Sequence, residues 1–120
     1  MPEVLLIDDN LAQLRTREAI LRGAGISVAC ASTAAEAFRH LRPKAAKVDV
    51  IVTDHVMPGV DGSVFVQQLR QLQPQTPVIV ISGLVEAEQQ YANSAVTFLR
   101  KPCKPESLIR AVRACKPAGL

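Results

Sequence analysis

The sequence of 120 residues has few aromatic side chains, no tryptophan and only three cysteines. The cysteines lack C-x-x-C spacing and are odd in number, which argues against a zinc site or a disulfide framework, so we expect Cys30, Cys103 and Cys115 to be free thiols. No apolar run approaches the roughly 20 residues of a membrane span. The amino terminus, MPEVLLIDD, is acidic where a signal peptide would be basic. We therefore expect a cytoplasmic protein without a membrane segment.

The composition is typical of a folded globular domain, with 48% hydrophobic and 21% charged residues. The length suits one domain, which we expect to span residues 1–120 with no output domain in this chain. The net charge of +3 comes from dispersed basic residues without interleaved aromatic side chains. We therefore expect no direct binding to nucleic acid.

Short apolar runs alternate along the chain with segments of helical periodicity. The patterns predict strands at 4–7, 26–30, 48–52, 78–81 and 96–99, and helices at about 11–22, 33–42, 63–72, 85–93 and 105–115. The helix at 85–93 has the weakest pattern. Five strand and helix pairs predict an α/β domain with a mostly parallel sheet, helices on both faces and right-handed crossovers.

Two of the predicted helices carry informative local signals. The stretch from Thr33 to Glu36 has the form of a capping box, in which a hydroxyl and a carboxylate bind the first free backbone N–H groups of a helix. In the helix at 11–22, Thr16 and Arg17 interrupt the apolar stripe to which Leu14 and Leu21 belong. The second helix thus has a well-defined start, whereas the first has an imperfect apolar face.

Polar side chains follow four of the predicted strands. Because parallel strands end at one edge of a sheet, we expect Asp8-Asp9, Asp54, Ser82 and Lys101 to converge there. Taken singly, these residues have ordinary explanations as helix caps, turn residues or solvated charges. Together they supply neighbouring carboxylates that need a proton or a cation, an ammonium and a hydroxyl, which suit Mg²⁺ and phosphoryl transfer to a carboxylate.

The motifs LLIDDN, IVTDHVMPGVDG, VIVISG and FLRKP occur in an order and spacing that resemble the response-regulator receiver domain of two-component signalling. The resemblance covers essentially the full chain. It implies a flavodoxin-like, doubly wound parallel sheet of five strands in the order 2-1-3-4-5, with five helices on two faces. It also implies a Mg-dependent transfer of a phosphoryl group to Asp54 from a histidine kinase or a histidine phosphotransfer protein.

The resemblance also implies a metal site for Mg²⁺ or Mn²⁺ at the phosphorylated residue. Asp54 itself contributes to it, Asp9 matches the direct metal ligand and Asp8 acts largely through water. Val56 offers its backbone carbonyl. His55, directly after the acceptor, is expected to point away from this edge of the sheet because adjacent strand residues face opposite ways.

Three further positions match the signalling machinery of the family. Lys101 would pair with the phosphoryl group, and Ser82 would donate its hydroxyl to a phosphoryl oxygen. Phe98 falls on the aromatic position that turns inward on activation, and the bond between Lys101 and Pro102 is commonly cis in the family. The resemblance thus predicts a switch that couples Ser82 to Phe98.

Val56 and Leu84 match the positions beside the path of the hydrolytic water. Both are apolar, so neither can orient water, and we expect slow loss of the phosphoryl group. We expect at most weak self-phosphorylation and self-dephosphorylation rather than an enzyme. A haloacid-dehalogenase-type phosphatase would require an aspartate at position 56. A receiver-like domain that docks partners without phosphorylation remains an alternative.

The resemblance also predicts the interaction surfaces. Phosphoryl donors would use the edge with the site and the first helix, whereas an output protein or a second copy in a homodimer would use the face of the fourth helix, fifth strand and fifth helix. The chain could be a stand-alone receiver, a phosphorelay intermediate, or a fragment of a longer regulator or hybrid kinase.

Overall fold

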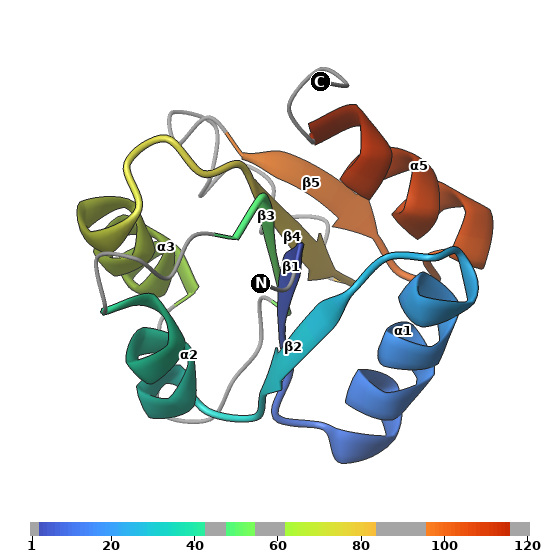
Figure 1. Cartoon of the computed structure of the whole chain (residues 1–120), viewed down its shortest axis with the longest axis horizontal. Coiled ribbons are helices and arrows are strands. Elements are labelled where there is room, and N and C mark those ends of the chain that lie inside the picture. The colour runs from blue at the N-terminus through green and yellow to red at the C-terminus, as the bar shows by residue number, and fades with distance from the viewer. Residues whose placement is uncertain (1–2, 43–47, 55–61, 84–95, 116–120) are drawn as a thin grey trace.

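The computed structural model describes residues 3–42, 48–54, 62–83 and 96–115, which form a parallel sheet with helices on both faces (Figure 1). Its elements are β1 (Val4–Ile7), α1 (Leu11–Gly23), β2 (Val28–Ala31), α2 (Ala34–Leu41), β3 (Val50–Asp54), α3 (Gly62–Leu72), β4 (Val78–Ser82), β5 (Thr97–Arg100) and α5 (Pro105–Cys115). The five strands are all parallel in the order β2-β1-β3-β4-β5, which confirms the predicted flavodoxin-like fold. The helix predicted at 85–93 lies outside the described residues.

Three strands lie later in the chain than the sequence pattern predicts. The pattern placed Ile26 in β2, but its backbone N–H donates to the carbonyl of Leu21 at 3.0 Å, so it belongs to the turn after α1. Val48 precedes β3, and Asp54 is the last residue of that strand. β5 likewise ends at Arg100. Apolar character located these strands, whereas backbone hydrogen bonds decided where they start and end.

The strand side chains alternate between two hydrophobic cores, as the pleat of a strand requires. One core joins Leu5, Ile7, Ile51, Val78 and Val80 to α2 and α3. The other joins Val4, Leu6, Val50, Val52, Ile79 and Ile81 to α1 and α5. The two helix pairs cover opposite faces of the sheet (Figure 1), which we call the α2/α3 face and the α1/α5 face.

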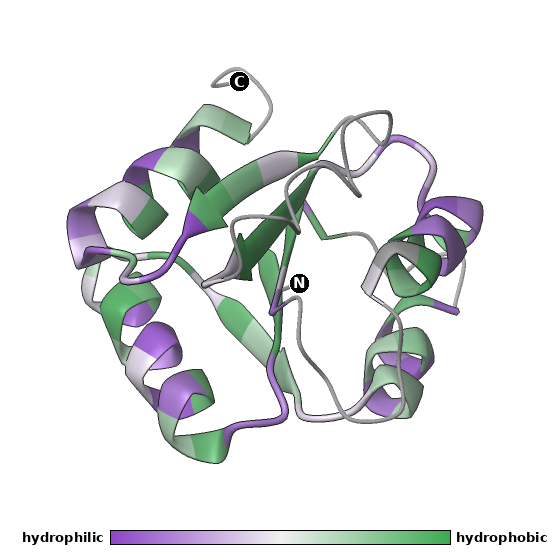
Figure 2. Cartoon of the chain, turned by 180° about the vertical axis from the view of Figure 1, so that it is seen from behind, coloured by the Kyte–Doolittle hydropathy of each residue, from purple (hydrophilic) through white to green (hydrophobic). Residues whose placement is uncertain are grey.

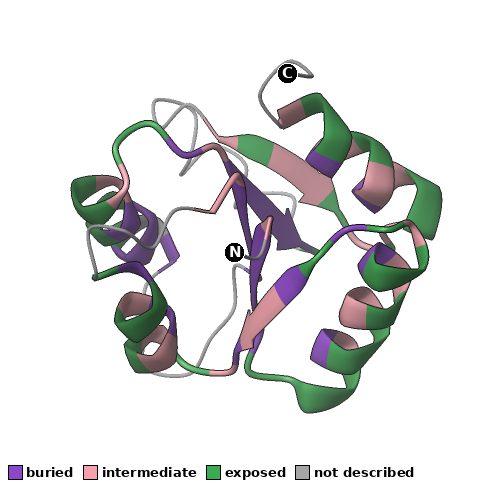
Figure 3. Cartoon of the chain, in the orientation of Figure 1, coloured by how far each residue is buried: buried purple, intermediate pink, exposed green. Residues whose placement is uncertain are grey.

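The central strands are therefore buried on both sides (Figure 3). The helices turn hydrophobic positions toward the sheet and hydrophilic positions outward (Figure 2). Within the described part of the chain, no helix is long and apolar enough to cross a membrane. The three cysteines are free thiols, as expected.

The predicted cap of α2 is present, with one change in its partners. The hydroxyl oxygen of Thr33 accepts from the backbone N–H of Glu36 at 3.0 Å. The Glu36 carboxylate accepts from the backbone N–H and the hydroxyl of Ser32, at 3.0 and 2.5 Å, where a standard capping box would use the N–H of Thr33. These hydrogen bonds from Ser32 hold the pKa of Glu36 below its ordinary value of 4.5.

The lowered pKa of Glu36 predicts a pH-dependent contribution to stability. Because the unfolded chain binds this proton more readily, the contribution is present above pH 4.5 and is lost as the pH falls through the lower folded-state pKa. Glu36→Gln should therefore reduce the free energy of unfolding at pH 7, and the difference from wild type should shrink in acid. Urea unfolding followed by circular dichroism across this pH range measures the difference.

Thr33→Ala is the matched control for this prediction. It removes the other half of the cap and should cost about 1 kcal/mol. Thr33 does not titrate, so its cost should change little with pH. A difference between wild type and Glu36→Gln that stays constant from pH 7 into acid would contradict the prediction.

Candidate functional site

Four strand ends bring polar side chains to the carboxyl edge of the sheet. Asp8 follows β1, Asp54 and Ser82 end β3 and β4, and Lys101 follows β5. These strands are direct neighbours in the order β1-β3-β4-β5, so the residues lie next to one another along that edge. Asp8, Asp54 and Ser82 are each at most 3% exposed. The structure thus brings together most of the residues that the sequence placed in one site.

Side chains alternate in direction along each strand, which determines the face of the sheet toward which each one points. Asp54 continues the series of Val50 and Val52, and Asp8 continues that of Val4 and Leu6, so both carboxylates belong to the α1/α5 face. This places them beneath α1. A side chain on the inner side of that helix can therefore reach both carboxylates.

Arg17 and Gln13 of α1 make these contacts. Nη1 of Arg17 lies 2.7 Å from Oδ2 of Asp8 and 3.6 Å from Oδ2 of Asp54. With the Gln13 amide turned so that its nitrogen faces the carboxylates, that nitrogen lies 3.0 Å and 3.2 Å from the same two oxygens. The other carboxylate oxygen of Asp8 accepts from the backbone N–H of Asn10 at 2.9 Å. Asp8 is thus fixed by partners on both of its oxygens.

Lys101 reaches Asp54 from the other side of the site. Its Nζ lies 2.7 Å from Oδ2 of Asp54, and its backbone N–H donates to the carbonyl of Ser82 at 2.9 Å. The bond between Lys101 and Pro102 is cis, as the family resemblance implied. Lys101 is therefore positioned both through its side chain and through its backbone.

By their positions along β4 and β5, Ser82 and Phe98 belong to the other face of the sheet, the α2/α3 face. Ser82 continues the series of Val78 and Val80, and Phe98 pairs with Val80 in the β4–β5 register. Phe98 is partly buried against the α2/α3 core. The two residues predicted to switch together therefore lie on adjacent strands and share one face of the sheet.

The carboxylates are electrostatically coupled to each other and to the cations around them. Burial raises the pKa of Asp8 above its ordinary value of 3.8, and the charge of Asp54 raises it further. The hydrogen bond from Asn10 and the charges of Arg17 and Lys101 act in the opposite direction. Two carboxylates therefore face two cationic side chains in a mostly buried site.

The donor chemistry of this edge suits a hard divalent cation. Mg²⁺ binds oxygen ligands, often one or two carboxylates together with water, and Asp8 and Asp54 provide such a pair. Asp9 is exposed, and among the described residues no group of three or more His, Cys, Asp or Glu side chains is placed to hold a metal ion. His55, Val56 and Leu84 lie outside the described residues.

The sequence patterns did not identify Arg17 and Gln13 as site residues. The available signal was the interruption of the apolar stripe of α1. Arg17 lies three residues after Leu14 and four before Leu21, and both leucines are buried, so Arg17 lies on the inner side of the helix. Asp8 and Asp9 do not cap this helix; Asn10 does, by accepting from the backbone N–H of Gln13 at 3.0 Å.

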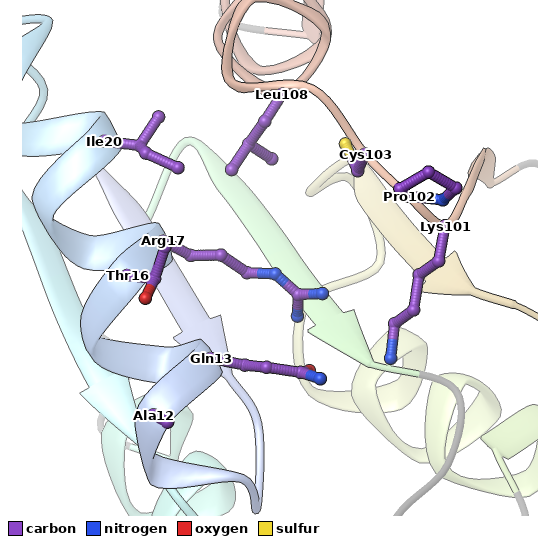
Figure 4. A pocket seen from close by; sticks show the side chains of 9 residues that line it. All are labelled: Ala12, Gln13, Thr16, Arg17, Ile20, Lys101, Pro102, Cys103 and Leu108. Atoms are coloured by element: carbon purple, nitrogen blue, oxygen red, sulfur yellow. The ribbon is translucent and has the colours of Figure 1, made fainter.

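A pocket of about 590 Å³ opens beside the carboxylates, between α1 and the segment that joins β5 to α5 (Figure 4). Arg17 and Gln13 extend across it from α1 toward the end of β3, and Lys101 points to the same place from the opposite wall. Ile20 and Leu108 form an apolar part of the lining. The cationic side chains of the site are thus also accessible from this pocket.

Comparison with known proteins shows what this chain is similar to. The sequence model of the response regulator receiver domain matches residues 4–113. Response regulator protein TodT of Pseudomonas putida is 32% identical, over 92% of this chain and 49% of TodT. Sensor kinase CckA of Brucella abortus is 31% identical, over 92% of this chain and 12% of CckA. The chain thus spans about half the length of TodT and a smaller part of CckA.

A solved structure extends the similarity to three dimensions. The receiver domain of a Francisella response regulator superposes with a TM-score of 0.83 at 30% identity, and the match covers 96% of each chain. A receiver domain from Clostridium thermocellum has a TM-score of 0.87 at 24% identity, covering 96% of this chain and 94% of that one. At this lower identity, the Clostridium thermocellum domain shows a similarity of fold alone.

The ion pair between Lys101 and Asp54 predicts a measurable contribution to stability. Lys101→Met leaves the buried Asp54 carboxylate without its 2.7 Å partner, and we expect it to lower the free energy of unfolding by about 1–3 kcal/mol. Urea unfolding near neutral pH measures the change. The control is Lys104→Met at an exposed neighbouring position, which should stay within about 0.5 kcal/mol of wild type. Equal effects of the two substitutions would contradict the prediction.

Proposed function

Because the chain belongs to the response regulator receiver domain family, whose members accept phosphoryl groups in two-component signalling, we propose that Asp54 is the phosphorylated residue. The observation that carries the proposal is the position of its carboxylate. Asp54 ends the central strand β3 at the carboxyl edge of the sheet, 2.7 Å from the ammonium group of Lys101. A nucleophile and a cation for the incoming phosphoryl group are thus already side by side.

The reaction is a direct transfer between two side chains. A carboxylate oxygen of Asp54 attacks the phosphorus of a phosphohistidine, and the bond between phosphorus and the histidine nitrogen breaks. The nitrogen keeps the electron pair, and Asp54 becomes an acyl phosphate. Lys101 then offsets negative charge on the phosphoryl oxygens, and Ser82 donates its hydroxyl to one of them. Phosphoryl transfer depends mainly on such positioning and charge compensation.

We further propose that Asp8, Asp9 and Asp54 hold Mg²⁺ or Mn²⁺ together with the carbonyl of Val56. As the family resemblance implies, Asp9 is the direct ligand and Asp8 acts largely through water. When bound, the metal neutralises charge on the carboxylates and on the transferred group. Asp8 is suited to this role because its orientation is fixed by the N–H of Asn10. Oxygen-only ligands favour these cations over zinc.

The proposed donors are histidine kinases and histidine phosphotransfer proteins, which would approach the carboxyl edge beside α1. The similar relatives include a response regulator and a sensor kinase, so receiver domains of this kind occur in proteins with different overall organisation. The proposed output surface comprises the fourth helix, which lies outside the described residues, together with α5 and β5, the strand that contains Phe98. Movement of Ser82 toward the phosphoryl group would change the packing of Phe98 on the neighbouring strand.

The proposal predicts phosphorylation by a small-molecule donor. Incubation with acetyl phosphate and Mg²⁺ should add the mass of one phosphoryl group to the wild type and none to Asp54→Asn. Intact-mass spectrometry measures the gain. Asp49→Asn is the matched control, since Asp49 precedes β3 at the opposite end of the strand and should not affect the reaction. No gain in wild type, as for a domain that only docks partners, or an undiminished gain in Asp54→Asn, would refute the proposal.

A second prediction concerns the lifetime of the phosphoryl group. Val56 and Leu84 are apolar and cannot orient water, so we expect a half-life of minutes or longer without an added phosphatase. Val56→Asn should shorten it, whereas Val64→Asn at an exposed position of α3 should not. Loss of the mass gain over time after removal of the donor measures the rate. A wild-type half-life of seconds would contradict the prediction.

A further inference from the structure

Arg17 is an unusual component of the site because it is a cation buried against two carboxylates that are proposed metal ligands. Its side chain is 11% exposed, while those of Asp8 and Asp54 are 1% and 3% exposed. An arginine that α1 needed only for solubility would lie on the outer side of the helix. Arg17 instead lies on the inner side, in line with the buried Leu14 and Leu21.

The guanidinium contacts both of the buried carboxylates that we propose as metal ligands. Nη1 of Arg17 is 2.7 Å from Oδ2 of Asp8 and 3.6 Å from Oδ2 of Asp54, so one group spans both carboxylates. With its amide turned so that the nitrogen faces the carboxylates, Gln13, one helical turn earlier, places that nitrogen 3.0 and 3.2 Å from the same two oxygens. Together, these two α1 side chains present hydrogen-bond donors to the carboxylate pair.

The charges of the four ionised side chains that meet at this site balance. Asp8 and Asp54 carry two negative charges, and Arg17 and Lys101 carry two positive charges, so these four contacting side chains are neutral together. Asp9, which is exposed, adds a negative charge outside this group. A divalent cation that enters such a group meets two like charges. Nearby like charges disfavour a charged species, just as they shift the pKa of an ionisable group.

We propose that Arg17 is an internal counter-ion that competes with divalent metal for Asp8 and Asp54, and so weakens metal binding by this receiver domain. The inference rests on the proposed function, because it concerns the same carboxylates. Arginine suits this role since its guanidinium is always charged and spans two carboxylate oxygens readily. A cation that binds Asp8, directly or through water, then competes with the guanidinium for Oδ2 of that residue.

The neighbouring pocket gives the displaced guanidinium a place to go. Arg17 lines this cavity of about 590 Å³, whose opposite wall carries Lys101 (Figure 4). The Arg17 side chain can therefore move away from the carboxylates into this pocket and does not have to enter the hydrophobic core. Arg17 and the metal then exclude each other at one oxygen, and their binding is reciprocally coupled.

The test is a metal titration without any phosphoryl donor. Binding of Mn²⁺ is followed by the electron paramagnetic resonance signal of the free ion, and binding of Mg²⁺ by calorimetry. A single nearby charge typically shifts an ionic equilibrium by about 1–3 powers of ten. Arg17→Gln should therefore bind Mn²⁺ at least about tenfold more tightly than wild type, whereas Arg17→Lys, which keeps the positive charge, should stay closer to wild type than Arg17→Gln does.

Arg15→Gln is the matched control, because Arg15 lies on the same helix with its side chain 67% exposed and paired to Glu18. It should leave the affinity unchanged. An Arg17→Gln protein that binds Mn²⁺ no more tightly than wild type, or does not bind it, overturns the inference. A gain in Arg15→Gln equal to that in Arg17→Gln also overturns it, because the effect would then reflect overall charge.

A second measurement on the wild type covers the case in which Arg17→Gln does not fold. The Nε–H resonance of Arg17 should shift as Mg²⁺ is added and exchange faster with water, while that of Arg15 should not. An unchanged Arg17 resonance at a Mg²⁺ concentration that saturates the domain overturns the inference. Tighter metal binding by Arg17→Gln together with no phosphorylation of wild type would support this inference and refute only the proposed function.

Discussion

Two buried carboxylates at the carboxyl edge of the sheet, those of Asp8 and Asp54, impose the main constraint on this structure. A buried charge is tolerated only when partners compensate its loss of hydration. Here the partners come from separate elements: Arg17 and Gln13 from α1, Lys101 from the segment after β5, and a backbone N–H after β1. The same carboxylates therefore tie the chemistry of the site to the packing of the helices around it.

The alternation of side chains along the strands explains why this arrangement is possible. Asp54 faces α1 because it shares its strand face with Val50 and Val52. A shift of β3 by one residue would turn the carboxylate toward the opposite core and away from α1. The burial of both faces of the sheet fixes this register, so the hydrophobic cores determine the direction of the polar groups at the edge.

Much of the site was predictable because its residues follow clear apolar runs. Asp8, Asp54, Ser82 and Lys101 could be placed together once the strands were recognised as parallel, since parallel strands end at a common edge. Strand boundaries were less predictable, as Ile26 shows: an apolar residue can continue a strand pattern while its backbone completes a helical turn. The role of Arg17 could not be predicted, because an arginine in a helix is usually a surface residue.

The sequence by itself determined the alternation of strands and helices, the identity of the polar strand ends and the cap of α2, because these depend on local periodicity and on neighbouring residues. The tertiary structure decided which elements became neighbours and thus which charges met. Arg17 and Asp54 are far apart in the chain, and their contact depends on how α1 packs over the edge of β3. That packing turns an interruption in an apolar helix face into an ion pair with the proposed phosphoacceptor.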